Sequence, residues 1–122
     1  MVNMGASNVQ GELPLYYGDS FVPNEQGTHG YSWIGRVVQT DITSNILRKY
    51  KCPKHIDLMS IDVEGFEPQV IQGIDFKKHN PYMIVVETDK VSPEEITNLL
   101  PTYYTNIKND GLNGVWISNK NI

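Results

Sequence analysis

Two acidic residues and a glycine stand close together in the middle of the chain, directly after an apolar stretch. Asp62, Glu64 and Gly65 follow residues 55–61, His-Ile-Asp-Leu-Met-Ser-Ile, which lean toward the composition of a buried strand. In an open α/β sheet, ligands bind in the crevice outside the carboxyl ends of parallel strands. A carboxylate at that edge can act as a general base toward a hydroxyl group, or bind a divalent cation. The segment therefore predicts a site where a strand ends.

The spacing also predicts how this site is built. We expect an interior strand from Ile56 to Val63, and its alternation would put Asp62 and Glu64 on the same side if the chain stays extended. Gly65 then lets the backbone turn without steric cost. Both acids are therefore candidate catalytic residues, although a purely structural turn stabilised by a helix dipole is an alternative for each.

A short helix is expected over residues 67–72, after the glycine. Pro68 is tolerated in its first turn and Gly73 is its expected C-cap. Glu67 stands at the start of this helix, where a capping or dipole partner is common, so we expect its role to be structural.

A third candidate acid ends the next apolar run. Residues 83–87, Met-Ile-Val-Val-Glu, form a continuous β-branched segment of the kind found in a sheet covered on both faces. If this strand lies parallel and adjacent to the strand before Asp62, Glu87 joins the same edge of the sheet as a candidate catalytic residue.

The remaining elements are predicted by turn and capping signals. Ser92 and Pro93 open the clearest helix of the chain, and Thr43 or Ser44 is the expected N-cap of an earlier helix that Pro53 ends. The other expected elements are an edge strand or hairpin arm at 9–17, a short extended segment at 37–40, and a terminal antiparallel hairpin of residues 103–108 and 114–118.

The order of these signals resembles the C-terminal half of the FkbM family of methyltransferases. The resemblance rests on Ile61-Asp62-Val63-Glu64-Gly65-Phe66-Glu67, then Val70-Ile71-Gln72-Gly73, then Pro81-Tyr82-Met83-Ile84-Val85-Val86-Glu87, and a late Gly111-Leu112-Asn113. It runs from about Asn3 to Ser118 and is most specific between Asp57 and Glu87. Ser60 departs from the family pattern, in which a lysine is common at that place.

The resemblance implies a partial Rossmann-like class I methyltransferase fold. The expected sheet is α/β, mostly parallel with a C-terminal antiparallel hairpin, and lacks the N-terminal cofactor-binding strands. The one glycine cluster, residues 27–35, follows no apolar strand, so we expect a mobile loop there instead of a nucleotide cradle. We expect a single partial domain, with an edge strand and mobile loop at 1–36 and an α/β core at 37–122. His29 in that loop could reach over the crevice, whereas His55 and His79 are expected to be ordinary solvated loop residues.

Composition excludes several classes. The formal net charge is −4, which argues against a nucleic-acid footprint. No apolar run approaches the length of a membrane span, and no secretory signal pattern opens the sequence. Cys52 is the single cysteine, so no internal disulfide forms and a reducing, cytoplasmic location is the default. Cys52 and His55 have ligand-like spacing but lack the partners that a zinc site needs.

The resemblance implies methyl transfer from S-adenosylmethionine to a hydroxyl of a sugar or secondary metabolite. Asp62 and Gly65 are then the expected cofactor-binding residues, with binding by this chain alone expected to be weak or absent. The alternatives are a non-catalytic fragment that needs a second chain or associates with itself, and a metal-assisted hydrolase that uses the same carboxylates.

Overall fold

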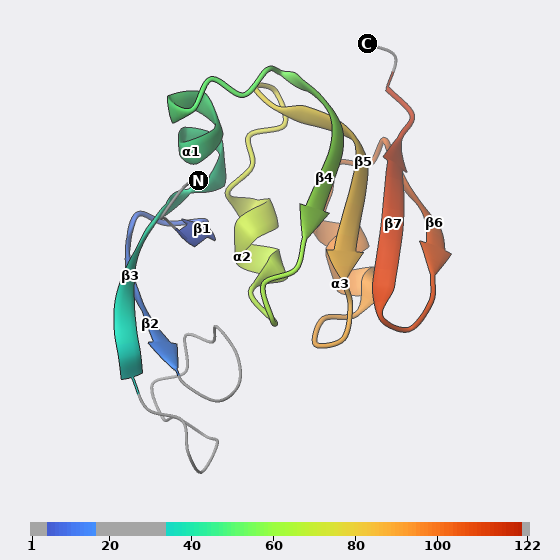
Figure 1. Ribbon diagram of the computed structural model, residues 1–122. Coiled ribbons are helices and arrows are strands. Elements are labelled where there is room, and N and C mark those ends of the chain that lie inside the picture. The colour runs from blue at the N-terminus through green and yellow to red at the C-terminus, as the bar shows by residue number, and fades with distance from the viewer. Residues whose placement is uncertain (1–4, 17–33, 121–122) are drawn as a thin grey trace.

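Two β-sheets and three helices make up the part of the chain that the computed structural model describes, residues 5–16 and 34–120 (Figure 1). In chain order the elements are β1 (Gly5–Ser7), β2 (Gly11–Tyr16), β3 (Ile34–Ile42), α1 (Thr43–Lys49), β4 (His55–Ile61), α2 (Glu67–Gln72), β5 (Asn80–Glu87), α3 (Pro93–Leu99), β6 (Tyr104–Asn109) and β7 (Asn113–Ser118). His29 and residues 27–33 of the glycine cluster lie outside the described residues. The last two positions of the cluster, Ile34 and Gly35, are described and begin β3.

The larger sheet has the strand order β4-β5-β7-β6. β4 and β5 are parallel, with Ile61 opposite Val86, and α2 lies between them in the sequence. β7 is antiparallel to both β5 and β6, so the predicted terminal hairpin is confirmed. The expected hairpin does not extend a mostly parallel sheet: among the described strands of the larger sheet only β4 and β5 pair in parallel, because β7 pairs with β5 in the opposite direction.

The smaller sheet has the order β1-β3-β2, with β1 parallel and β2 antiparallel to β3. β2 is an edge strand and contains Pro14, as expected for a strand with a missing backbone donor. The sequence predicted only a short extended segment at 37–40, but β3 runs from Ile34 to Ile42. Pairing on both edges by distant segments lengthens this strand, and that pairing leaves no local signal.

The start of α1 also differs from expectation. Ile42 is the N-cap, and neither Thr43 nor Ser44 caps the helix. Both side chains are buried and bond elsewhere: the Thr43 hydroxyl donates to the carbonyl of Val70 at 2.7 Å, and the Ser44 hydroxyl accepts from the Asp75 N–H at 2.6 Å. They join α1 to α2 and to the loop after it. α2 and the Ser92 N-cap of α3 are confirmed.

The core lies between the larger sheet and helices α2 and α3, and Figure 1 shows α3 behind that sheet. Its fully buried side chains include Ile71, Ile84, Val86, Ile96 and Trp116. The register places the alternate residues Leu58, Met83, Val85, Val115 and Ile117 on the opposite face. No described helix covers that face, so the expected covering of Met83–Glu87 on both sides is not found within the described residues. None of the described helices has the length and apolar character that crossing a membrane requires.

Candidate active site

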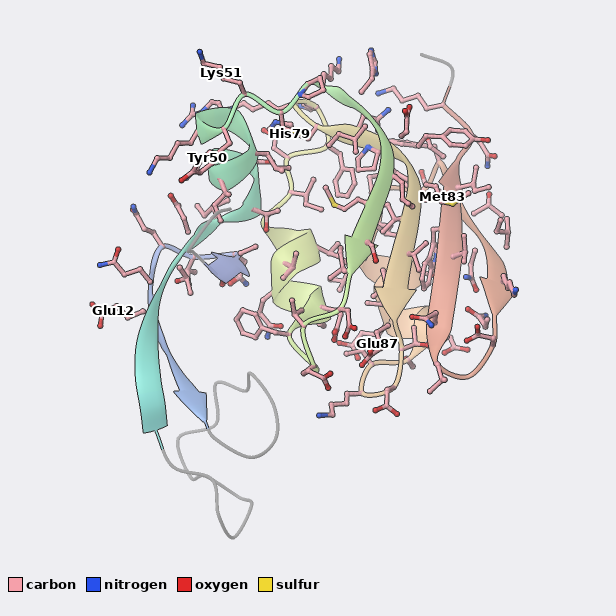
Figure 2. All side chains as sticks on the ribbon, in the orientation of Figure 1. Glu12, Tyr50, Lys51, His79, Met83 and Glu87 are labelled. Atoms are coloured by element: carbon pink, nitrogen blue, oxygen red, sulfur yellow. The ribbon has the colours of Figure 1, made fainter. Side chains whose placement is uncertain are left out.

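The ends of β4 and β5 bring the candidate acids to one edge of the larger sheet. Because the two strands are parallel and adjacent, the residues that follow Ile61 meet those that follow Val86. Figure 2 shows Glu87 at the carboxyl end of β5, beside the loop that leaves β4. The arrangement is the one expected for a ligand site in an open α/β sheet.

Three carboxylates converge at this edge. One carboxylate oxygen from each of Asp62, Glu67 and Glu87 lies within 4.8 Å of the other two. Asp62 is exposed, Glu87 is half-buried, and Glu67 is only 1% exposed. We call these three residues the acid cluster. Its oxygen atoms are spaced so that they could hold a divalent cation, for which carboxylates are suitable ligands.

Glu87 is strongly affected by its neighbours. A hydrogen bond with the Asp62 side chain, followed by desolvation and by repulsion from Asp62, Glu64 and Glu67, raises the pKa of Glu87 from 4.5 to about 7. Two carboxyl groups that share a hydrogen bond cannot both be charged without a large cost, so the pair keeps a proton into the neutral range. Such a pair can exchange a proton with a substrate near pH 7.

Glu64 lies outside the acid cluster, which corrects the expected alternation. β4 ends at Ile61, and Glu64 has a φ of 52°, so the chain is no longer extended where the alternation was assumed. Its carboxylate is 3.4 Å from the ammonium of Lys90 instead, with both side chains partly exposed. No motif or spacing in the sequence marks Lys90 as part of this region.

Gly65 turns the chain as predicted. Its φ is 99°, a region that residues with a Cβ rarely adopt. Its backbone N–H donates to the Glu67 carboxylate at 2.9 Å. Whether Gly65 also contacts a cofactor stays a prediction.

Glu67 belongs to the acid cluster, although the sequence predicts only a structural role for it at the start of a helix. Its two oxygens accept separate hydrogen bonds from the N–H groups of Val63 and Gly65, at 2.8 Å and 2.9 Å. The expected structural role is therefore present, but the same carboxylate also belongs to the acid cluster. The sequence feature that could have identified Glu67 is its place two residues after Gly65 and close to Asp62.

The histidines contribute nothing to the acid cluster within the described residues. His55 is exposed at the start of β4. His79 is 4% exposed, which corrects the expectation of a solvated loop residue, and its Nδ1 lies 3.2 Å from the Ser44 hydroxyl oxygen. Burial against α1 lowers the pKa of His79 below 6.5.

Two polar hollows lie elsewhere on the described surface. One of about 300 Å³ is lined by Gln10, Gly11, Glu12, Gln39, Thr40 and Asp41, on β2, β3 and the residues next to β2. Another of about 180 Å³ is lined by Pro93, Glu94, Thr97, Asn98 and Asn106. Neither includes a residue of the acid cluster.

Parallel strands that end in clustered acids, followed by a helix and a closing antiparallel hairpin, define an α/β domain with an acid cluster at one sheet edge. A family model for the methyltransferase FkbM domain matches residues 2–109. The chain belongs to the FkbM methyltransferase family. A search of curated proteins and a search of solved structures each found no match.

Proposed function

We propose that this chain is an S-adenosylmethionine-dependent O-methyltransferase domain, with a hydroxyl of a sugar or secondary metabolite as its acceptor. The observation that carries the proposal is the closeness of the Asp62 and Glu87 carboxylates, whose oxygens lie within 4.8 Å of each other in the acid cluster at the carboxyl ends of two parallel strands. Family membership supplies the reaction class, and the pair supplies a base for a hydroxyl acceptor.

The chemistry assigned to the pair is proton acceptance. S-adenosylmethionine, when bound, supplies a methyl group on a positively charged sulfur. Glu87 or Asp62 would take the proton of the acceptor hydroxyl, so that the oxygen becomes nucleophilic enough to accept that methyl group. Because the pKa of Glu87 is about 7, its carboxylate is a suitable base at neutral pH.

The described residues suit only part of the cofactor. Asp62 and Gly65 would hold it, because a carboxylate can accept hydrogen bonds from its polar groups and the glycine permits close approach of the backbone. No glycine-rich loop that follows a strand and opens a helix occurs within the described residues. We therefore expect this chain alone to bind the cofactor weakly, and we propose that a further segment or chain beside β4 completes the site. The lone cysteine, Cys52, favours a reducing cytoplasm as the place of action.

NMR titration of ¹⁵N-labelled protein with S-adenosylmethionine tests the proposal. We expect weak, saturable shifts of the amides of Asp62, Gly65 and Glu87, and we expect Asp62→Asn to remove most of them. S-adenosylhomocysteine is the matched ligand without the methyl group and should move the same amides. No shift at these positions would contradict the proposed cofactor site, and low-micromolar affinity would contradict the proposal that the site is incomplete.

The acid cluster supports a second candidate, a metal-assisted hydrolase. Three carboxylate oxygens within 4.8 Å of one another could hold a divalent cation that activates water. In that case Mg²⁺ or Mn²⁺ should raise the melting temperature, and Asp62→Asn should abolish the gain. An unchanged melting temperature for the unsubstituted chain would rule against this candidate.

A further inference from the structure

The turn between β4 and α2 has an unfavourable backbone. Glu64 and Gly65 both have positive φ, 52° and 99°, and the N–H of Phe66 donates to the carbonyl of Val63 at 3.1 Å. Positive φ at both central residues is the pattern of a type I′ turn, which usually carries Asn, Asp or Gly at these positions. A glutamate at the first of them is strained by its Cβ, so the surrounding structure must hold the turn in place.

The Glu67 carboxylate contacts the two amides that flank the strained residue. Oε2 accepts from the Val63 N–H, just before Glu64, and Oε1 accepts from the Gly65 N–H, just after it. Because Glu67 is 1% exposed, water cannot easily replace these bonds. The Glu67 carboxylate does not cap α2. The N-cap position of this helix is Phe66, and no side chain forms a capping hydrogen bond at it.

We propose that Glu67 is a positioning residue that holds the turn of residues 63–66 in the shape that keeps Asp62 beside Glu87. This role deepens the proposed function and rests on it. Both Glu67 oxygens are engaged by the backbone, whereas Asp62 is exposed and available to a ligand. Asp62 and Glu87 then act on the substrate, and Glu67 acts only through the turn.

Glu67→Gln tests the role, because an amide can accept one of the two bonds but must point its NH₂ group at the other N–H. We expect hydrogen exchange of the Val63 or Gly65 amide to accelerate by at least about tenfold beyond any change in global stability. The shifts that S-adenosylmethionine induces at Asp62 and Glu87 should be lost as well. Ile71→Val is the matched control. Ile71 is fully buried in the same helix, and its apolar side chain cannot accept a hydrogen bond from the turn.

Two results would overturn the role. Exchange at Val63 and Gly65 that matches the Ile71→Val control would show that Glu67 does not hold the turn. Faster exchange with unchanged cofactor-induced shifts would show that the turn does not position the site. If the unsubstituted protein shows no cofactor-induced shift, the proposed function fails, and the exchange arm still judges the contact between Glu67 and the turn.

Gly65→Ala provides a second arm that does not depend on Glu67→Gln folding. An alanine at φ 99° is strained, although its Cβ would meet only the Lys90 side chain at 3.5 Å. Gly111→Ala is the control, with a φ of 89° and nothing within 4 Å of the added Cβ. We expect only Gly65→Ala to accelerate hydrogen exchange of the Val63 amide, which bonds to Glu67, and equal exchange of that amide in both variants would contradict the proposal.

Discussion

Among single residues, Glu87 has a pKa that neighbouring acidic groups raise strongly. Its carboxyl group is hydrogen-bonded to Asp62 and lies in the field of Glu64 and Glu67, which raises its pKa to about 7. The sequence predicts Glu87 as an acid that ends a strand. Its pKa shift depends on Asp62, which lies beside it because β4 and β5 pair in parallel.

The raised pKa of Glu87 predicts a pH-dependent stability. Between about pH 4.5 and about pH 7 the folded protein keeps a proton that the unfolded chain has lost, so this contribution to the free energy of unfolding is present at low pH and lost as the pH rises. Glu87→Gln imitates the protonated form at every pH. We therefore expect the melting temperature of the unsubstituted protein, measured relative to Glu87→Gln, to fall between about pH 4.5 and about pH 7.

The comparison with Glu87→Gln isolates this residue. His79 has a lowered pKa, so its contribution to stability is present above pH 6.5 and lost as the pH falls, which is the opposite direction. Because His79 is the same in both proteins, its effect cancels in the difference. A difference in melting temperature that does not change with pH would contradict the proton-sharing pair.

Residue types and spacing identified Asp62 and Glu87 as candidates. They did not reveal that Glu64 lies outside the acid cluster and pairs with Lys90. Alternation along an extended strand assigned Glu64 to the same side as Asp62, and that assignment failed because the strand ends at Ile61 and the next residues turn. The turn depends on the buried Glu67 carboxylate, which is a contact that residue spacing does not reveal.

At the scale of elements, Gly73 shows how α2 is joined to the smaller sheet. The residue is the C-cap of α2, as expected, but its φ is −81°, so the left-handed conformation that often favours glycine at a helix end is not the reason for it. A Cβ at Gly73 would lie 1.9 Å from the carbonyl oxygen of Ser7 and 2.8 Å from the nitrogen of Thr43. Close approach of β1 and α1 therefore requires glycine here.

This contact predicts a large effect of Gly73→Ala. The added methyl group must displace backbone of β1 or α1, so we expect the free energy of unfolding to fall by about 2 kcal/mol or more. Gly11→Ala is the matched control, because its Cβ would meet only the Thr40 hydroxyl oxygen at 4.0 Å, and we expect a change within about 0.5 kcal/mol. Urea denaturation of both variants measures the difference, and similar values would show that β1 does not pack against α2 in solution.

Across the whole molecule, no described strand pairs with the outer edge of β4, and no described helix covers one face of the larger sheet (Figure 1). β4 is an edge strand, Leu58 on it is 55% exposed, and the same face carries Met83, Val85, Val115 and Ile117. An open edge next to apolar side chains favours association with another strand. These features support the proposal that a second chain or a copy of this chain covers β4.

Association through β4 predicts a mass above that of one chain in size-exclusion chromatography with light scattering, increasing with concentration. Leu58→Lys places a charge on the edge strand and should shift the protein toward monomer. Leu112→Lys is the control, because Leu112 is 62% exposed in the turn between β6 and β7 and lies off the sheet face. A stable monomer for the unsubstituted protein at all concentrations would contradict association.

Several elements could be predicted from amino-acid order because the signals for them are local. The acidic turn after an apolar strand, the Ser92-Pro93 helix start, the terminal hairpin and the family motif all depend on residues close together in the chain. The length of β3, the burial of His79 and the raised pKa of Glu87 beside Asp62 follow instead from the folded arrangement. These features arise from contacts between segments far apart in sequence, and the energy of such contacts depends on distance and burial, which residue order does not specify.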